Sequence, residues 1–266
     1  MRLTQMFVHP MKSGRGIEYA SAYAAMQGLL HDREWLVTTP DGRFLTARDY
    51  PGMVRIEMDL IPGGMLLKAQ GRNPIMAMTQ VYKHAVATAV WKDEFTAYHG
   101  DTAVDAWLSE TIGTPCQLLW LGMKSTRAFK GSGQALSFAD GYPFLLVNHA
   151  SLNALNAELA SPVTTRHFRP NFVVDAEAPY EEDDWLVVRI GELIFDVAKP
   201  CTRCQLTTVN PENGQFANDN EPMRTLIRTR QLPEGICFGV NLVARNEGLV
   251  QVGDEFEVLE SRYGFE

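Results

Sequence analysis

Glycine and proline divide this chain into short pieces, and this punctuation limits its fold more than any other feature. The 266 residues include 21 Gly and 14 Pro. Turn pairs such as Asp41-Gly42, Gly63-Gly64 and Asn213-Gly214 separate runs that are apolar or that alternate between apolar and polar residues. Short runs of this kind are typical of strands. The chain is therefore predicted to be mainly β with a few helices, an α+β protein.

The expected elements follow from these runs. Strands are predicted at residues 3–10, 35–39, 54–60, 65–69, around 97–98, and at 117–121, 172–174, 186–190, 193–197, 239–243 and 256–259. Helices are predicted at 102–111, 151–159 and 222–228. In the first, Val104, Trp107 and Leu108 share one face, and in the second Ser151 is the expected N-cap.

One segment suggests a division of the chain. Residues 124–135 carry Lys124, Arg127 and Lys130 among small residues, which predicts a surface linker. We therefore expect a boundary between residues 90 and 135, with one domain at 1–120 and a second at 121–262.

Composition excludes several function classes. A formal charge of −8 and a pI near 5.3 argue against general nucleic-acid binding, which needs a basic surface. An anionic ligand must then meet a local basic pocket. The N-terminus lacks an apolar run of signal-peptide length, and nowhere do 18 apolar residues follow one another. We expect a cytoplasmic protein that does not bind membranes. Four cysteines are too few for a disulfide scaffold and fit a reducing compartment.

The segment Lys199-Pro200-Cys201-Thr202-Arg203-Cys204 places two thiols beside two cationic side chains, directly after a predicted strand. Such a setting favours a thiolate that can bind a soft metal. A zinc site would need two further ligands, which no second cysteine pair supplies. A thioredoxin-type pair would need a helix after it, whereas Gln205-Leu-Thr-Thr-Val209 is β-branched. The motif alone is equally compatible with two half-buried structural cysteines.

Three other motifs suit an anionic or heterocyclic ligand. Lys12-Ser13-Gly14 follows the first predicted strand and combines a cation, a hydroxyl and backbone N–H groups. Arg33 precedes the strand that begins at Trp35, and Phe168-Arg169-Pro170-Asn171 precedes another. Each arginine taken alone is equally compatible with an ordinary surface residue.

Taken in order along the chain, these motifs resemble the MOSC family (molybdenum cofactor sulfurase C-terminal-like proteins) with its N-terminal β-barrel companion domain. Pro-Met-Lys-Ser, Asp-Arg-x-Trp and Thr46-Ala47-Arg48 match the companion domain, and Phe-Arg-Pro-Asn followed by Pro-Cys-x-Arg-Cys-x-x-Thr-Thr-Val matches the MOSC domain. The resemblance covers about residues 2–260. Within this family, the chain resembles the YcbX-type reductases and the mitochondrial amidoxime-reducing component.

The resemblance implies a MOSC β-barrel, a β-barrel-like N-terminal domain and a bound molybdenum–molybdopterin cofactor, with no requirement for pyridoxal phosphate. It implies that Cys204 ligates the metal and that Asp140 faces the metal's open side to deliver or orient a proton. The residues implied to contact the cofactor are Lys12, Ser13, Arg33, Arg169, Asn171, Thr202, Arg203 and Cys204. Gly141-Tyr142 departs from the Thr-Ser that follows this aspartate in the mitochondrial relatives.

The implied reaction is the two-electron reduction of N-hydroxylated compounds such as hydroxylamines, amidoximes and 6-hydroxylaminopurine. The chain shows no Cys-x4-Cys-x2-Cys run of a plant-type ferredoxin, so a separate ferredoxin- or flavoprotein-type partner is expected to supply electrons. Two alternatives stay open. Cys204 would carry a persulfide in a sulfur carrier or transferase, or the protein would bind the cofactor without turnover.

Overall fold

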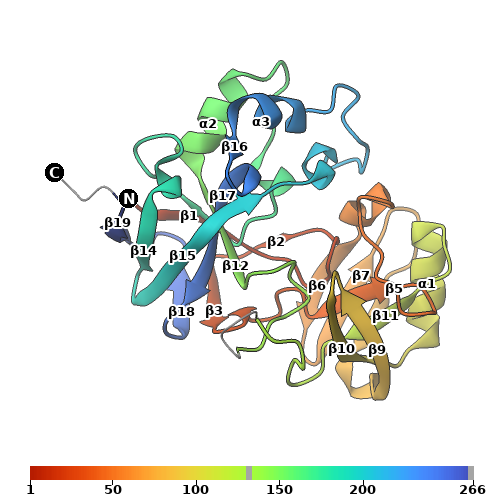
Figure 1. Cartoon of the computed structure of the whole chain (residues 1–266). Helices are drawn as coiled ribbons and strands as arrows, with labels where there is room; N and C mark the ends of the chain where they lie inside the picture. Colours follow the sequence, from red (N-terminus) through yellow and green to blue (C-terminus); the bar gives the residue numbers. More distant parts are fainter. Residues whose placement is uncertain (130–133, 263–266) are drawn as a thin grey trace.

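The computed structural model of the protein describes residues 1–129 and 134–262. It is mainly β, as predicted, with 19 strands and three α-helices among the described residues. Every predicted strand is present within a few residues. Figure 1 places the strands and helix of residues 35–120 at one end of the molecule and those of residues 144–261 at the other.

The larger end is built on one nine-stranded sheet. Its strand order is β19-β14-β15-β17-β12-β13-β1-β2, and β16 also pairs with β17. The strands are β19 (Phe256–Ser261), β14 (Trp185–Ile190), β15 (Leu193–Thr202), β17 (Gly235–Ala244), β12 (Phe144–Asn148), β13 (Phe172–Val174), β1 (Leu3–Val8), β2 (Ile17–Glu18) and β16 (Gln231–Leu232). The first strand of the chain therefore lies in a sheet made mostly of C-terminal strands.

Three smaller sheets complete the fold. One has the order β5-β11-β10-β9, from β5 (Trp35–Thr38), β11 (Gln117–Trp120), β10 (Asp93–His99) and β9 (His84–Val90). A second pairs β18 (Gly248–Gln251), β3 (Ser21–Ala25) and β4 (Gly28–Leu29), and a third pairs β6 (Glu57–Ile61), β7 (Gly64–Lys68) and β8 (Ile75–Met78). The short 3₁₀ turns are η1 (Pro51–Arg55), η2 (Thr79–Val81), η3 (Thr165–His167), η4 (Glu181–Asp183) and η5 (Gln205–Thr208).

The two expected barrels are not found as closed sheets among the described residues. Closure requires a continuous ladder between the first and last strands, and the nine-stranded sheet ends at β19 on one side and β2 on the other. Arg2 and Glu255 form an isolated antiparallel bridge just ahead of β1 and β19. The chain ahead of β1 therefore meets the chain ahead of β19 at one bridge, and no ladder forms between β19 and β2.

The helices lie close to their predicted places. In α1 (Thr102–Ile112) the Asp101 side chain caps the N-terminus by accepting from the Ala103 N–H at 2.9 Å, and Gly113 ends the helix with a φ of 83°. For α2 (His149–Ala157), the prediction that Ser151 is the N-cap is wrong. Asn148, extended at the end of β12, accepts from the Ala150 N–H instead, and Ser151 donates to Glu182. The third helix, α3, is Met223–Thr229.

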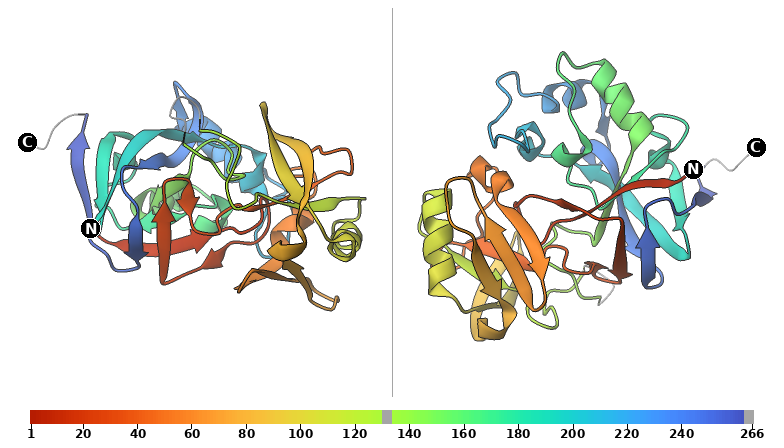
Figure 2. Two further views of the ribbon diagram at one scale, coloured as in Figure 1. Left: turned by 90° about the horizontal axis from the view of Figure 1, so that it is seen from below. Right: turned by 180° about the vertical axis from the view of Figure 1, so that it is seen from behind.

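The two largest of the four hydrophobic clusters among the described residues lie at the two ends of the molecule. One is formed mainly by side chains of the nine-stranded sheet. The other is formed by side chains of β5, β7 and α1 together with Met11 from the loop after β1. Val209, which follows η5, is buried in the second core although it comes from the C-terminal half of the sequence. Both views in Figure 2 show the chain passing between the two ends.

The predicted surface linker at 124–135 is only partly described, because residues 130–133, including Lys130, lie outside the described residues. Arg127 contradicts the expectation of a surface position. It is almost fully buried, since its guanidinium bonds to the Asp93 carboxylate and to the carbonyls of Ser137, Ala139 and Asp140. No helix among the described residues has the length and apolarity needed to span a membrane.

Candidate active-site cleft

A cleft of about 460 Å³ gathers the predicted site residues from distant parts of the sequence. It is lined by loops at the ends of β1, β5, β12 and β15 and by the turn between β9 and β10. Every residue predicted for the site lies in its walls: Lys12, Ser13, Arg33, Asp140, Arg169, Asn171, Thr202, Arg203 and Cys204. The sequence motifs therefore converge on one place, although their roles there are not tested by this convergence.

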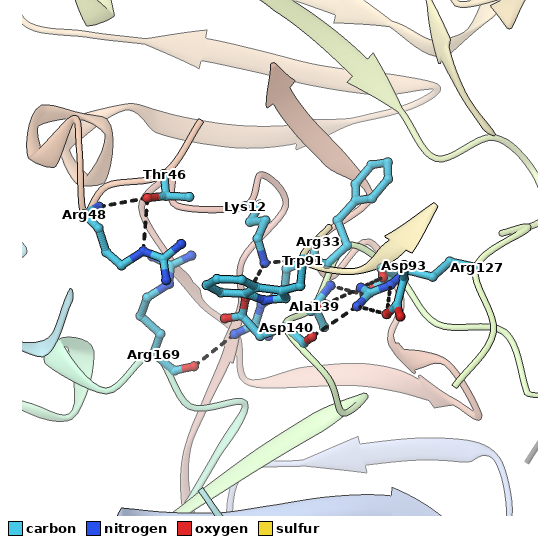
Figure 3. A network of polar contacts seen from close by, with 12 residues as sticks. Lys12, Arg33, Thr46, Arg48, Trp91, Asp93, Arg127, Ala139, Asp140 and Arg169 are labelled. Atoms are coloured by element: carbon cyan, nitrogen blue, oxygen red, sulfur yellow. Dashed lines mark hydrogen bonds and ion pairs between the residues drawn. The ribbon is translucent and has the colours of Figure 1, made fainter. Parts of the chain in front are cut away.

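Lys12 and Asp140 form the central ion pair of the cleft, drawn in Figure 3. The Lys12 ammonium donates to Asp140 Oδ1 at 2.7 Å and to the Phe138 carbonyl at 2.9 Å, and the Trp91 indole N–H donates to the same carboxylate oxygen at 2.9 Å. Enclosure by the cleft alone would raise the pKa of Asp140. The Lys12 charge and these hydrogen bonds outweigh it and hold the pKa well below its usual range.

The two partners differ in exposure. The Lys12 side chain is buried, whereas 72% of the Asp140 side chain is exposed to the cleft. Burial lowers the pKa of Lys12 from its ordinary value, and the Asp140 carboxylate opposes this shift. Lys12 therefore holds the Asp140 carboxylate in its ionised form.

Arg33 and Asn171 brace the wall behind the ion pair. Arg33 donates to the Asp32 carboxylate, to Asn171 Oδ1 at 3.1 Å and to the Arg169 carbonyl at 3.0 Å. Asn171 also accepts from the Leu145 N–H and donates to the Phe7 carbonyl. These contacts join β1, β5, β12 and β13, so both side chains hold the cleft in shape.

Arg169 lies close to the positive charges of Arg33 and Arg203. Its guanidinium donates to the Gly14 carbonyl at 2.5 Å. Burial, followed by the nearby charge of Arg33, lowers the pKa of Arg169 to about 9. An anion bound beside this guanidinium would relieve that repulsion.

The backbone of the cleft is strained. Among the described residues other than glycine, seven have a positive φ, and four of these line the cleft: Ser13, Arg33, Trp91 and Arg169, with φ between 52° and 68°. Bulky residues rarely adopt this conformation, and such strain is concentrated at functional sites.

The two thiols of the Cys-x-x-Cys motif have different surroundings. Cys201 lies within β15 rather than in a loop, and Arg203 donates to its sulfur at 3.0 Å. Cys204 is exposed and immediately precedes η5, where its carbonyl accepts from the N–H and hydroxyl of Thr207. The Arg203 guanidinium is thus directed to Cys201 and to the Phe168 carbonyl. Its buried Nε has no partner among the described residues.

Several cleft residues were not among the predicted site residues. Arg48 lies over the Trp91 ring at 4.3 Å, and Lys199 lies 5.5 Å from the Tyr142 ring centroid. Arg48 belongs to the quoted Thr-Ala-Arg motif. The sequence analysis did not identify Trp91 as a site residue. The one feature that could have marked it is its place in a two-residue hairpin turn, where Asn-Gly is the usual sequence.

The charge of the cleft is opposite to that of the chain. Its described walls hold six cationic side chains and one carboxylate, in a protein with a formal charge of −8. The cations are Lys12, Arg33, Arg48, Arg169, Lys199 and Arg203, and the carboxylate is Asp140. This is the local basic pocket that an anionic ligand requires. No group of three His, Cys, Asp or Glu side chains is placed to hold a metal ion within residues 1–129 and 134–262.

The chain is similar to known proteins over most of its length. The chain is 29% identical to a molybdenum cofactor sulfurase of Oryza sativa, over 91% of this chain and 32% of that protein. It is also 29% identical to the mitochondrial amidoxime-reducing component 1 of Mus musculus, over 97% of this chain and 82% of that protein. The chain spans about a third of the length of the plant molybdenum cofactor sulfurases that it matches. In a comparison of structures, the crystal structure of the YUAD protein from Bacillus subtilis aligns with 96% of this chain and over 93% of its own chain. The sequence identity is 8% and the TM-score is 0.45.

Two domain families account for most of the sequence. Residues 1–115 match the MOSC N-terminal beta barrel domain, and residues 133–257 match the MOSC domain. The motifs quoted from both halves fall within these matches and line one cleft. The chain belongs to the MOSC family and combines a MOSC domain with the MOSC N-terminal domain.

Proposed function

We propose that this protein is a molybdenum-cofactor-dependent reductase of N-hydroxylated compounds. The observation that carries the proposal is the exposed Cys204 thiol in a cationic cleft of an acidic protein. The relatives named as amidoxime-reducing components, which the chain matches over most of their length, support the same reaction. Candidate substrates are amidoximes, hydroxylamines and 6-hydroxylaminopurine.

The residues of the cleft fit the proposed cofactor. Its volume lies in the range of small-molecule and cofactor sites, about 300–1,000 Å³. An exposed thiol can supply a soft thiolate ligand to a metal. The unpartnered Arg203 Nε and the lowered pKa of Arg169 support the binding of a negatively charged group here. Cys204 would ligate the metal, and Ser13, Arg169, Thr202 and Arg203 would contact the pterin and its phosphate.

When bound, this cofactor would supply the two-electron reduction that breaks the N–O bond. The protein's own groups would position the substrate and handle the proton. Because Asp140 is ionised, it accepts hydrogen bonds from a substrate N–H or O–H and does not act as the first proton donor. The Lys12 ammonium, 2.7 Å away and with a lowered pKa, is the acid of the pair. Electrons would come from a separate ferredoxin- or flavoprotein-type partner.

The reaction itself provides the test. Protein produced in a host that makes molybdopterin is mixed with a reduced viologen dye and benzamidoxime, and benzamidine formation is measured. Parent protein is expected to turn over, and Cys204→Ala is expected to be inactive. Cys116→Ser, which removes a buried cysteine outside the cleft, serves as the matched control and should retain activity. Equal activity in the parent and Cys204→Ala would refute the assigned role of Cys204.

A second candidate function is sulfur transfer through a persulfide on Cys204. The exposed thiol and the relatives named molybdenum cofactor sulfurase favour it. In that case the purified protein would release sulfane sulfur on treatment with cyanide, and Cys204→Ala would not. A protein that binds the cofactor without turnover would fail both the reductase and the sulfur assays.

A further inference from the structure

Trp91 lines the cleft with a backbone conformation that is energetically unfavourable for tryptophan. It begins the two-residue turn between β9 and β10, with a φ of 58°. Its side chain is large and apolar, yet the residue is 51% exposed. Neither turn propensity nor burial explains this choice, because Asn or Gly would form the turn with less strain.

The indole ring is nevertheless held firmly, as Figure 3 shows. Its N–H donates to Asp140 Oδ1 at 2.9 Å, and the Arg48 guanidinium lies 4.3 Å from the ring. Phe44 contacts it edge-on, with ring centroids 5.6 Å apart. A side chain fixed on several sides but still half exposed presents a preformed surface to whatever enters the cleft.

The turn end of the hairpin is tied to the loop that carries Asp140, through Asp93, the first residue of β10. The Asp93 carboxylate accepts from Arg127 Nε and Nη2 at 3.1 and 2.9 Å, and Arg127 also donates to the carbonyls of Ser137, Ala139 and Asp140. Since Arg127 is buried, this link is shielded from solvent. The distance between the Trp91 ring and the Asp140 carboxylate is therefore set by the fold.

The arrangement has a direct chemical consequence. Both described hydrogen bonds to the Asp140 side chain end on Oδ1, so Oδ2 is available to a ligand in the cleft. A flat ring resting on the indole would place an N–H or O–H group attached to that ring beside this oxygen. A puckered ring of the same size would lose the stacking contact while keeping the polar one.

We infer that Trp91 determines specificity and selects substrates whose N-hydroxylated group is conjugated to a planar ring. This inference rests on the proposed function for the identity of the reacting group. It goes beyond that function in naming a stacking surface and the planar class of substrate. Trp91 would contact the ring of the substrate, and Asp140 Oδ2 would accept from its polar group.

Matched pairs of compounds separate stacking from every other contribution. Benzamide and cyclohexanecarboxamide are both neutral and carry the same amide, but only the first has a flat ring. Their dissociation constants are measured by NMR titration of the protein as purified. The corresponding amidoximes are then compared by kcat/KM. The binding experiment needs no turnover, so it decides the inference even if the protein proves not to be a reductase.

Three variants make the comparison specific. Trp91→Ala removes the ring, Trp91→Phe keeps an aromatic face but loses the N–H bond to Asp140, and Tyr23→Ala removes an exposed aromatic side chain on β3, outside the cleft. The parent is expected to bind benzamide about tenfold more tightly than cyclohexanecarboxamide. Trp91→Ala should abolish this ratio, Trp91→Phe should keep most of it, and Tyr23→Ala should not change it.

Other outcomes would overturn the inference. Equal or undetectable binding of the two amides by the parent excludes a stacking surface. If Trp91→Ala and Trp91→Phe weaken both amides by the same factor, the indole only positions Asp140. Failure of the proposed function has a different signature, because the parent would then reduce neither amidoxime while the ratio of amide affinities persists.

Discussion

Burial and neighbouring charges shift the pKa values of single residues in this protein. Asp140 is kept ionised by Lys12 and Trp91, which makes it an acceptor in the cleft. Glu182 is the opposite case. It is fully buried, its Oε2 accepts from Ser151 at 2.7 Å and Asn148 at 3.2 Å, and burial raises its pKa to about 7.

The raised pKa of Glu182 predicts a pH-dependent stability. The folded protein binds this proton more tightly than the unfolded chain, so stability falls as pH rises from the ordinary carboxyl pKa towards 7, and the loss is complete above 7. The shift corresponds to roughly 3 kcal/mol. Urea unfolding at pH 5 and pH 8 should show this loss in the parent, whereas Glu182→Gln should show a much smaller one. Identical pH dependence in both proteins would contradict a protonated Glu182.

The sequence located the site residues but not their partners. Lys12, Arg33 and Asn171 were found because their motifs match a family, and all three line the cleft. Lys12 bonds to Asp140, 128 positions away, and Arg33 bonds to Asn171, 138 positions away. Such pairings depend on sheet topology, which a single sequence does not contain. Trp91 was missed because nothing local marks a turn residue as part of a pocket formed by other strands.

At the scale of elements, the local rules of capping and turn formation account for most boundaries. The prediction of α1 held because a capping aspartate, an apolar face and a terminal glycine agree. Ser151 failed as a cap because Asn148 reaches the helix start first from the end of β12. The eight strands that were not predicted include the two-residue β2, β4 and β16, which exist through pairing rather than through their own sequence pattern.

The cap of α1 can be tested by itself. Asp101→Ala removes the acceptor for the Ala103 N–H and should lower the free energy of unfolding by about 1 kcal/mol. Asp101→Asn keeps a side-chain oxygen at the same place and should cost much less. Urea denaturation of the three proteins measures the difference, and an equal loss in both variants would show that the carboxylate charge matters more than the hydrogen bond.

The whole molecule brings both ends of the sequence to one cleft. Lys12 and Arg33 come from the first 35 residues, and Cys204 is followed by Val209, which is buried in the core around α1. The boundary predicted near residue 120 stays a prediction. A ligand in the cleft would contact both ends and stabilise the fold as a unit.

Anion binding provides a prediction at this scale. Inorganic phosphate at millimolar concentration should raise the Tm of the parent above that in sodium chloride of equal ionic strength, because it relieves the repulsion around Arg169. For a protein of this size, each kcal/mol of stabilisation raises the Tm by about 2–4 °C. Arg169→Ala should lose the effect, whereas Arg228→Ala, an exposed arginine outside the cleft, should retain it. Loss in both variants would indicate general screening.

The metal content of the protein tests the central claim most directly. Parent, Cys204→Ala and Cys116→Ser are purified from a host that synthesises molybdopterin, and molybdenum per chain is determined by elemental mass spectrometry. The account predicts near-stoichiometric molybdenum in the parent and in Cys116→Ser, with little or none in Cys204→Ala. No molybdenum in the parent, or equal molybdenum in the parent and Cys204→Ala, would contradict Cys204 as the metal ligand.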